Sequence, residues 1–380
     1  MDKLLLVTRN FPPLVGGMER LNLRMAESLS GYYEVRIIAP EGASRYALND
    51  TVVRHAPLRP LWRFLSVSAW LALREARAWK PDIVLAGSGL TAPIALAAAR
   101  ACGALAAVYV HGLDLAVPHP VYRALWHPAL RRLDAVIANS RATAWLARAV
   151  GIATDRTDIV HPGTSLPSPD RAARARFRQL HQLGNDPVLL SVGRLTSRKG
   201  LREFVAEALP KIVARFPTAR LLIAGDAPAQ ALYAESQSPE SILAAAHAAG
   251  VGGHLLFLGW ISDDEMLADA YAGADLHVFP VRDLPRDPEG FGMVALEAAA
   301  HALATVAYAT GGVIDAVGEG VSGRLVAPGD SDAFARAVIA LLEHRLPEDR
   351  VRGFPARFAW PRFGEKVRAA LERHRTGVVI

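Results

Sequence analysis

Short apolar runs rich in Val, Ile and Leu alternate with alanine-rich helical stretches along nearly the whole of this chain. Such alternation is typical of parallel sheets whose two faces are both covered by helices. A first series of expected strands lies at 4–8, 35–40, 82–87, 105–112 and 134–140. A second series lies at 187–194, 219–226, 254–260, 274–280, 304–310 and 323–329. The alternation therefore predicts an α/β fold with two parallel sheets.

The two series are separated by HPGTSLPSPD, 161–170, a segment rich in Pro, Gly and Ser without periodicity. A chain of 380 residues also exceeds what one hydrophobic core usually supports. We therefore expect two tandem Rossmann-like, doubly wound domains that face a central cleft, an N-terminal one over 1–165 and a C-terminal one over 166–360. The basic amphipathic helix expected over 361–380 would pack back on the first domain.

Three features of the sequence bear on the cellular compartment. No stretch of about 18 residues is free of charges and helix breakers, so we expect no membrane-spanning helix. The N-terminus, MDKLLLVTRNFPP, lacks the cleavage site of a secretory signal. The single cysteine, Cys102, lies in an apolar segment and suggests an unreactive core thiol in a reducing compartment. We therefore expect a cytoplasmic protein.

Charge is distributed unevenly along the chain. Residues 1–180 carry an excess of Lys and Arg, whereas 181–360 carry an excess of Asp and Glu. A basic half favours acidic partners such as phospholipid head groups or diphosphate lipids. Nucleic acid is not expected as a partner, because the chain contains no recognisable nucleic-acid-binding module.

The segment PEGFGMVALE, 288–297, holds two carboxylates, Glu289 and Glu297, around a pair of glycines. On one continuous helix their positions would differ by about 12 Å of rise, beyond the roughly 5 to 9.5 Å of glycosidase pairs. A helix that begins near Gly292 would instead point its free N–H groups at an anion. Carboxylates accept hydrogen bonds from sugar hydroxyls. The pattern therefore favours hydroxyl clamps beside a phosphate site, with a solvated loop Glu and an ordinary helix Glu as the alternative.

Two cations, Arg194 and Lys199, stand at another expected strand-to-helix junction, in SVGRLTSRKG. An Arg fork and a Lys point charge suit a diphosphate there, although an exposed turn has the same composition. The pair Gly16 and Gly17, in NFPPLVGGMER, follows the first expected strand and is a candidate phosphate or sugar loop. It is not the GxGxxG fingerprint, so a Rossmann dehydrogenase is disfavoured.

Together these motifs resemble those of the retaining glycosyltransferases of family 4, which have the two-domain GT-B fold. The spacing of Glu289 and Glu297, the EGFG segment and the order of the other motifs agree with this family over nearly the whole chain. The segments EGFGMVALEAA and GGMER are similar to those of mannosyltransferases that act on lipid or polyprenol acceptors. The resemblance implies a hexosyltransferase whose substrate is a nucleotide sugar.

The same resemblance implies which residues bind the donor. Arg194 and Lys199 would hold the diphosphate, Glu297 would bind the ribose, and Glu289 would bind the hexose hydroxyls. The backbone of Gly290, Phe291 and Gly292 would contact the sugar and the phosphate, and the Gly16–Gly17 loop would contact the phosphate. The base would be held by Leu258, Gly259 and Trp260.

The implied catalytic set is His111, Arg194, Lys199 and Glu289. His111, in VYVHGLD, matches the family's histidine near the primary hydroxyl of the sugar. Asp114 and Asn139 would lie on the acceptor side, with Asp114 the less secure match.

The resemblance also implies retention at the anomeric carbon, with no metal ion and no cofactor apart from the donor itself. The Asp-x-Asp pattern Asp330 to Asp332 is typical of a helix N-cap rather than of a metal site. No nucleophile is expected to face the sugar. We therefore expect a front-face displacement in which an oxygen of the donor phosphate accepts the proton of the acceptor.

The segment 57–80, PLRPLWRFLSVSAWLALREARAWK, mixes Trp62, Phe64, Trp70 and Trp79 with five Arg and Lys side chains. A basic aromatic segment of this kind can lie in the interface of an anionic membrane, beside a lipid-linked acceptor. A core-facing helix with solvated arginines explains the same residues, so both interpretations stay open.

We therefore expect a retaining hexosyltransferase that transfers mannose from GDP-mannose to a lipid-linked or glycan acceptor, in the synthesis of a surface polysaccharide or glycolipid. Peripheral contact of 57–80 with the inner face of the cytoplasmic membrane would fit this function. One alternative is a UDP-sugar-dependent glucosyl, galactosyl or N-acetylglucosaminyl transferase with a soluble acceptor. Another is a non-catalytic protein that binds a nucleotide sugar.

Overall fold

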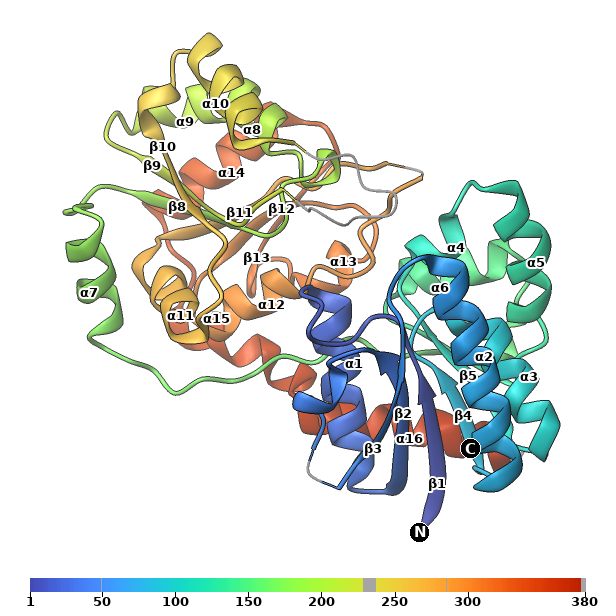
Figure 1. The fold of residues 1–380 in the computed structure, drawn as a ribbon. Coiled ribbons are helices and arrows are strands. Elements are labelled where there is room, and N and C mark those ends of the chain that lie inside the picture. The colour runs from blue at the N-terminus through green and yellow to red at the C-terminus, as the bar shows by residue number, and fades with distance from the viewer. Residues whose placement is uncertain (49, 228–236, 285, 377–380) are drawn as a thin grey trace. The chain divides into compact units, whose positions relative to one another are not determined.

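The computed structural model describes residues 1–48, 50–227, 237–284 and 286–376 (Figure 1). The chain divides into two compact units. The first contains Met1–Gly163 and the segment that begins at Phe358, and the second contains Thr164–Arg357. Each unit holds one sheet of parallel strands with helices between the strands in the chain. This arrangement confirms the predicted α/β, doubly wound fold.

The sheet of the first unit has seven strands in the order β3-β2-β1-β4-β5-β6-β7, and its ladders are parallel. The strands are β1 (Asp2–Val7), β2 (Tyr33–Pro40), β3 (Val52–Ala56), β4 (Ile83–Ala86), β5 (Leu105–Val110), β6 (Ala135–Ala138) and β7 (Thr157–Ile159). The helices are α1 (Gly17–Ser30), α2 (Leu61–Ala78), α3 (Ala92–Cys102), α4 (Leu113–Ala116), α5 (Pro120–Leu130), α6 (Arg141–Ala149) and α16 (Trp360–Thr376).

The sequence predicts the five inner strands of this sheet and misses its two edge strands, β3 and β7. Strands β4, β5 and β6 are buried at every residue, so each reads as a continuous apolar run. By contrast, β3 exposes Arg54 and His55, and β7 has three residues of which none is buried. Edge strands of this kind have no apolar pattern by which they could be recognised.

Helices cover both faces of the first sheet. Helices α2, α3 and α5 lie side by side along one face, and α1 packs against α16 on the other (Figure 1). The hydroxyl of Tyr33 donates to Glu372 on α16 at 2.5 Å, and His374 on α16 lies 2.8 Å from the carboxylate of Asp158. The C-terminal helix is thus fastened to β2 and to β7.

The sheet of the second unit has six strands in the order β10-β9-β8-β11-β12-β13, again with parallel ladders. The strands are β8 (Val188–Val192), β9 (Arg220–Ala224), β10 (Leu255–Gly259), β11 (Leu276–Phe279), β12 (Thr305–Tyr308) and β13 (Gly323–Val326), all in predicted segments. The helices are α7 (Ala173–Leu180), α8 (Leu201–Glu207), α9 (Leu209–Arg215), α10 (Pro239–Ala248), α11 (Asp264–Gly273), α12 (Met293–Ala300), α13 (Val313–Ala316), α14 (Ser331–Glu343) and α15 (Glu348–Gly353).

The segment 57–80 contains α2, whose two faces differ. Phe64 and Leu71 are buried on the face that packs on the sheet and on α3. Trp62 and Trp70 point the other way and are 69% and 59% exposed. The core-facing interpretation therefore holds for one face, and the opposite face presents two tryptophans to solvent.

None of the helices in the described ranges is both long enough and apolar enough to cross a membrane. Cys102, at the end of α3, is partly buried, and burial raises the pKa of its thiol. A raised pKa leaves less thiolate at neutral pH, and an unreactive thiol stays a prediction for Cys102.

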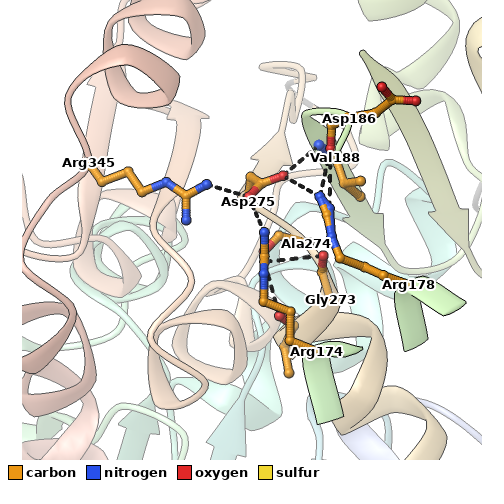
Figure 2. A network of polar contacts seen from close by, with 9 residues as sticks. Arg174, Arg178, Asp186, Val188, Gly273, Ala274, Asp275 and Arg345 are labelled. Atoms are coloured by element: carbon orange, nitrogen blue, oxygen red, sulfur yellow. Dashed lines mark hydrogen bonds and ion pairs between the residues drawn. The ribbon is translucent and has the colours of Figure 1, made fainter. Parts of the chain in front are cut away.

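A network of arginines closes the amino ends of β8 and β11 (Figure 2). At its centre is Asp275, whose side chain is only 3% exposed. One carboxylate oxygen accepts from Arg174 at 2.7 Å and from Arg345 at 2.5 Å. The other accepts from Arg178 at 3.0 Å and from the backbone N–H of Val188 at 2.8 Å. One carboxylate thus joins α7, the segment after α14 and the starts of β8 and β11.

Replacing Asp275 with Asn should lower the free energy of unfolding by about 3 kcal/mol, because the buried Arg178 would lose its charged partner. Asp186→Asn is the matched control, since Arg178 also contacts Asp186, but through the backbone carbonyl. Urea unfolding of both variants measures the difference. Equal stability of wild type and Asp275→Asn would contradict the role of the network.

The same comparison has a defined pH dependence. Burial alone would raise the pKa of Asp275, but the Val188 amide and Arg174 lower it. A carboxyl group whose pKa is lower in the folded state stabilises the fold above its unfolded pKa and loses this contribution as the pH falls. The stability gap between wild type and Asp275→Asn should therefore be widest near neutrality and shrink below about pH 4.

Candidate functional site

The carboxyl ends of β8 and β11 bring Lys199 and Glu289 together. Lys199 ends a 3₁₀ turn after β8, and Glu289 lies in the loop between β11 and α12. The Lys199 ammonium donates to Glu289 Oε2 at 2.8 Å and stands 4.6 Å from the centre of the Phe279 ring. Their side chains are 13% and 11% exposed. They form a largely buried ion pair at the sheet edge where doubly wound folds bind ligands.

Burial and charge act in opposite directions on this pair. Burial would raise the pKa of Glu289, but Lys199 and Arg198 lower it to about 2. Burial lowers the pKa of Lys199, and the charge of Glu289 opposes that effect. Glu289 is therefore ionised at neutral pH, so it can accept hydrogen bonds but has no proton to donate.

Arg194, the other predicted cation, is exposed at the same edge. Within the described residues its guanidinium has no ion pair or hydrogen bond, but its charge acts on both Lys199 and Glu289. The structure therefore brings Arg194, Lys199 and Glu289 to one place. The guanidinium N–H groups of Arg194 are therefore available to bind an anion.

The sequence did not single out Arg198, which also belongs to this cluster. Its Nη1 donates to Asp287 Oδ1 at 2.9 Å, and its Nε lies 3.3 Å from Glu289 Oε2. Its position next to Lys199 was the only signal available. A run of basic residues does not show which side chain turns inward, and the fold of the turn decides this.

Helix α12 begins just after Gly292, where the sequence predicts a helix start. Gly292 is its N-cap, with φ 91°, a value that favours glycine. A Cβ on Gly312 would lie 2.0 Å from the carbonyl oxygen of Gly290, and the N–H of Gly312 donates to the carbonyl of Glu289 at 2.9 Å. Phe291 is buried. This packing fixes the backbone of 289–292 beside the N–H groups at the helix start.

Glu297 lies on α12, as predicted. The hydroxyl of Tyr271, on α11, donates to its Oε2 at 3.2 Å. The Tyr271 ring stacks on His301, with 5.2 Å between the ring centres. These contacts orient the carboxylate from the side of α11.

The residues predicted to hold a base lie at the carboxyl end of β10. Leu258 packs on the apolar core. The carbonyl of Gly259 accepts from the N–H of Gly225 at 2.8 Å, and Trp260 is 48% exposed. In this group, Trp260 presents the side chain most accessible to a ligand.

In the first unit, Gly16 and Gly17 open a helix, as predicted. Gly16 is the N-cap of α1 and Gly17 its first residue. Asn10, in the loop after β1, donates to Glu19 in the first helical turn at 2.8 Å. This contact ties the glycine loop to the helix that it precedes.

His111, at the end of β5, is buried, and its Nε2 lies 2.9 Å from the carbonyl oxygen of Gly87, to which it can only donate. Asp114 accepts from the backbone N–H of His111 at 2.9 Å and from that of Gly89 at 2.8 Å. The amide of Asn139 lies 3.4 Å from the carbonyl of His111. Asp114 thus joins two loops with both its oxygens, and the acceptor-side role of Asp114 and Asn139 stays a prediction.

In the parts of the chain that the structure describes, no group of three or more His, Cys, Asp or Glu side chains could hold a metal ion. Asp330 accepts from the N–H of Ala333 at 2.7 Å and caps α14, which confirms the predicted N-cap. Asp332 forms an ion pair with Lys211 at 2.5 Å.

Two protein-family models match the chain. The one described as Glycosyltransferase Family 4 matches residues 15–166. The one described as Glycosyl transferases group 1 matches residues 186–344.

Two mycobacterial proteins are similar to this chain over most of its length. Each is a GDP-mannose-dependent alpha-(1-6)-phosphatidylinositol monomannoside mannosyltransferase. The protein of Mycobacterium tuberculosis is 32% identical over 368 residues, which cover 91% of this chain and 90% of that protein. The protein of Mycolicibacterium smegmatis is 33% identical over 361 residues, with 89% of each chain covered.

Solved structures resemble this chain in fold. HepE of Anabaena, in complex with UDP, has a TM-score of 0.80 at 19% identity, covering 97% of this chain and 99% of that one. Sucrose-phosphate synthase of Thermosynechococcus elongatus has a TM-score of 0.79 at 22% identity and full coverage of both. Together with the family models and the mycobacterial relatives, these likenesses show that the chain belongs to glycosyltransferase family 4, has the GT-B fold and is a glycosyltransferase.

Proposed function

We propose that this glycosyltransferase transfers mannose from GDP-mannose to a lipid-linked or glycan acceptor, with retention at the anomeric carbon. The observation that carries the proposal is the Lys199–Glu289 pair beside the start of α12, with Glu297 on the same helix. The names of the mycobacterial relatives support GDP-mannose as donor and a phosphatidylinositol mannoside type of acceptor. The product would be a surface polysaccharide or a glycolipid.

In this proposal the donor lies along the carboxyl edge of the second sheet. Lys199 and Arg194 bind the diphosphate, and the free N–H groups of α12 point at the same anion. Glu289 accepts hydrogen bonds from the hexose hydroxyls, and Glu297 accepts them from the ribose. The base contacts the end of β10, where Trp260 is exposed.

The proposed reaction is a front-face displacement. The bond between C1 of the mannose and the leaving diphosphate oxygen breaks, while the acceptor oxygen bonds to C1 from the same face. The proton of the acceptor hydroxyl passes to an oxygen of the donor phosphate. Lys199 and Arg194, rather than a metal ion, stabilise the negative charge that grows on the diphosphate. For His111 the family resemblance implies a contact with the primary hydroxyl of the sugar, and this role stays a prediction.

The outer face of α2 supports a peripheral contact with the inner face of the cytoplasmic membrane. Beside the exposed Trp62 and Trp70, this helix exposes Arg63, Arg74 and Arg77. The guanidinium carbon of Arg74 lies 5.5 Å from the centre of the Trp70 ring. Tryptophan rings among arginines suit the head-group layer of an anionic membrane. Such a contact would bring the enzyme to a lipid-linked acceptor.

Lys199→Ala should lower the rate of mannosyl transfer by about 100-fold or more, because it removes a preorganised charge from the leaving diphosphate. Lys211→Ala is the control, since Lys211 lies on α9 and pairs with Asp332 at the surface. Transfer from radiolabelled GDP-mannose to a membrane extract measures the rate. A Lys199→Ala variant with near-normal turnover would remove the basis of the proposed site.

The donor is identified by the thermal shift produced by GDP, UDP, ADP, dTDP and NAD. A ligand that binds only the folded state raises Tm, so we expect stabilisation by GDP. Glu297→Ala should abolish most of this shift because the ribose loses its acceptor, whereas Glu343→Ala, on α14, should keep it. A shift with UDP instead of GDP would refute the mannosyl donor, and a shift with NAD alone would refute the whole assignment.

Reversing the charges of Arg63, Arg74 and Arg77 to Glu should abolish co-sedimentation with vesicles that contain phosphatidylglycerol. Each basic side chain near an anionic surface contributes about 1 kcal/mol to binding. The control reverses three exposed arginines of the second unit to give the same net charge: Arg171, Arg336 and Arg350. Equal loss of binding in both triple variants would show that net charge alone matters and would reject α2 as the contact.

A further inference from the structure

Arg198 holds three consecutive residues ahead of α12. Its Nη1 donates to Asp287 Oδ1 at 2.9 Å and to the carbonyl oxygen of Pro288 at 3.2 Å. Its Nε lies 3.3 Å from Glu289 Oε2, which is an ion pair without the geometry of a hydrogen bond. The side chain is 11% exposed, so these contacts are made largely away from water. One planar guanidinium thus fixes both the path of the loop and the carboxylate at its end.

A backbone hydrogen bond also holds Arg198 in place. The carbonyl of Arg198 accepts from the N–H of Arg282 at 2.8 Å, at the start of the same loop. The side chain of Arg282 in turn lies 3.0 Å from Glu203 on α8. The turn that carries Arg198 is therefore joined to both ends of the loop between β11 and Glu289.

Two cations share one oxygen of Glu289. Lys199 and Arg198 both contact Oε2, at 2.8 and 3.3 Å. In the proposed complex Lys199 also binds the diphosphate, so the diphosphate competes with Glu289 for the Lys199 ammonium. A largely buried carboxylate without a cationic partner is strongly destabilised, so Glu289 would move if Lys199 were its only partner. Arg198 is the second partner, and its other contacts keep it in place.

We propose that Arg198 is the positioning residue for the sugar end of the donor, which holds Glu289 in place while Lys199 turns to the diphosphate. This inference rests on the proposed donor site. It assigns different tasks to adjacent residues: Lys199 meets the phosphates, and Arg198 maintains the clamp on the hexose. Removing Arg198 should therefore weaken the contribution of the sugar to binding and leave that of the nucleotide nearly unchanged.

The test compares Arg198→Gln and Arg198→Lys with wild type by calorimetry, using GDP and GDP-mannose. The affinity for GDP-mannose should fall by about tenfold or more in both variants, because Glu289 and the loop that carries it lose the guanidinium that holds them in place. The affinity for GDP should change by less than about threefold. Lys keeps the charge but cannot reach three partners, so rescue by Arg198→Lys would overturn the positioning role.

Arg202→Gln is the matched control, because Arg202 is 56% exposed on the next turn and its closest partner, Glu203, lies 3.9 Å away. It removes the same charge from the same region and should alter neither affinity. Equal losses for GDP and GDP-mannose in Arg198→Gln would overturn the inference, as would unchanged affinity for both. Ligand-free Tm values show whether a variant is folded.

The experiment separates this inference from the proposed function. UDP and UDP-glucose are titrated in parallel against wild type. If wild type binds none of the four ligands, GDP, GDP-mannose, UDP and UDP-glucose, the proposed donor site is wrong and the inference about Arg198 is wrong with it. If wild type binds GDP-mannose and Arg198→Gln binds it equally well, the donor site stands and only the role of Arg198 is wrong.

Discussion

A buried ion pair, Lys199 with Glu289, organises the carboxyl edge of the second sheet. Removing two charges from water is costly unless they meet each other with good geometry. Here the two atoms are 2.8 Å apart, and Arg198 supplies a second cation to the same oxygen. In the proposed complex Glu289 meets the hexose and Lys199 turns to the diphosphate, and these two side chains lie side by side at one sheet edge. Charges that a fold holds close to the reacting groups reduce the reorganisation that catalysis requires.

The two edges of the second sheet use charge differently. At the amino edge, three arginines form ion pairs with Asp275, so these charges hold elements together. At the carboxyl edge Lys199 and Arg198 both contact Glu289, and Arg194 is exposed. Beneath them, burial and the charge of Lys199 lower the pKa of His277 to about 3, so this histidine stays neutral. The exposed Arg194 is thus a cation at this edge that an anion can reach.

The sequence predicts the elements that have an apolar pattern and the residues that belong to a recognisable motif. The buried runs of β4, β5 and β6 and the spacing from Glu289 to Glu297 are of this kind. It could not predict Arg198 or the contacts of Asp114. Both depend on which side chain a turn directs inward, and this is decided by backbone geometry after the fold has formed. The sequence also could not decide which side chains of α2 face the core and which face solvent, because aromatic and basic residues suit both a core edge and a membrane surface.

The low pKa of Glu289 distinguishes two roles that its position alone would allow. A general acid has to carry a proton at working pH, and a general base has to be basic enough to take one. With a pKa of about 2, Glu289 fulfils neither condition near neutrality. A weakly basic carboxylate still accepts hydrogen bonds, and a clamp on sugar hydroxyls needs nothing more. The proton of the acceptor then has to go elsewhere. The leaving diphosphate gains negative charge as its bond to C1 breaks, so it becomes the base that the proposed front-face displacement requires.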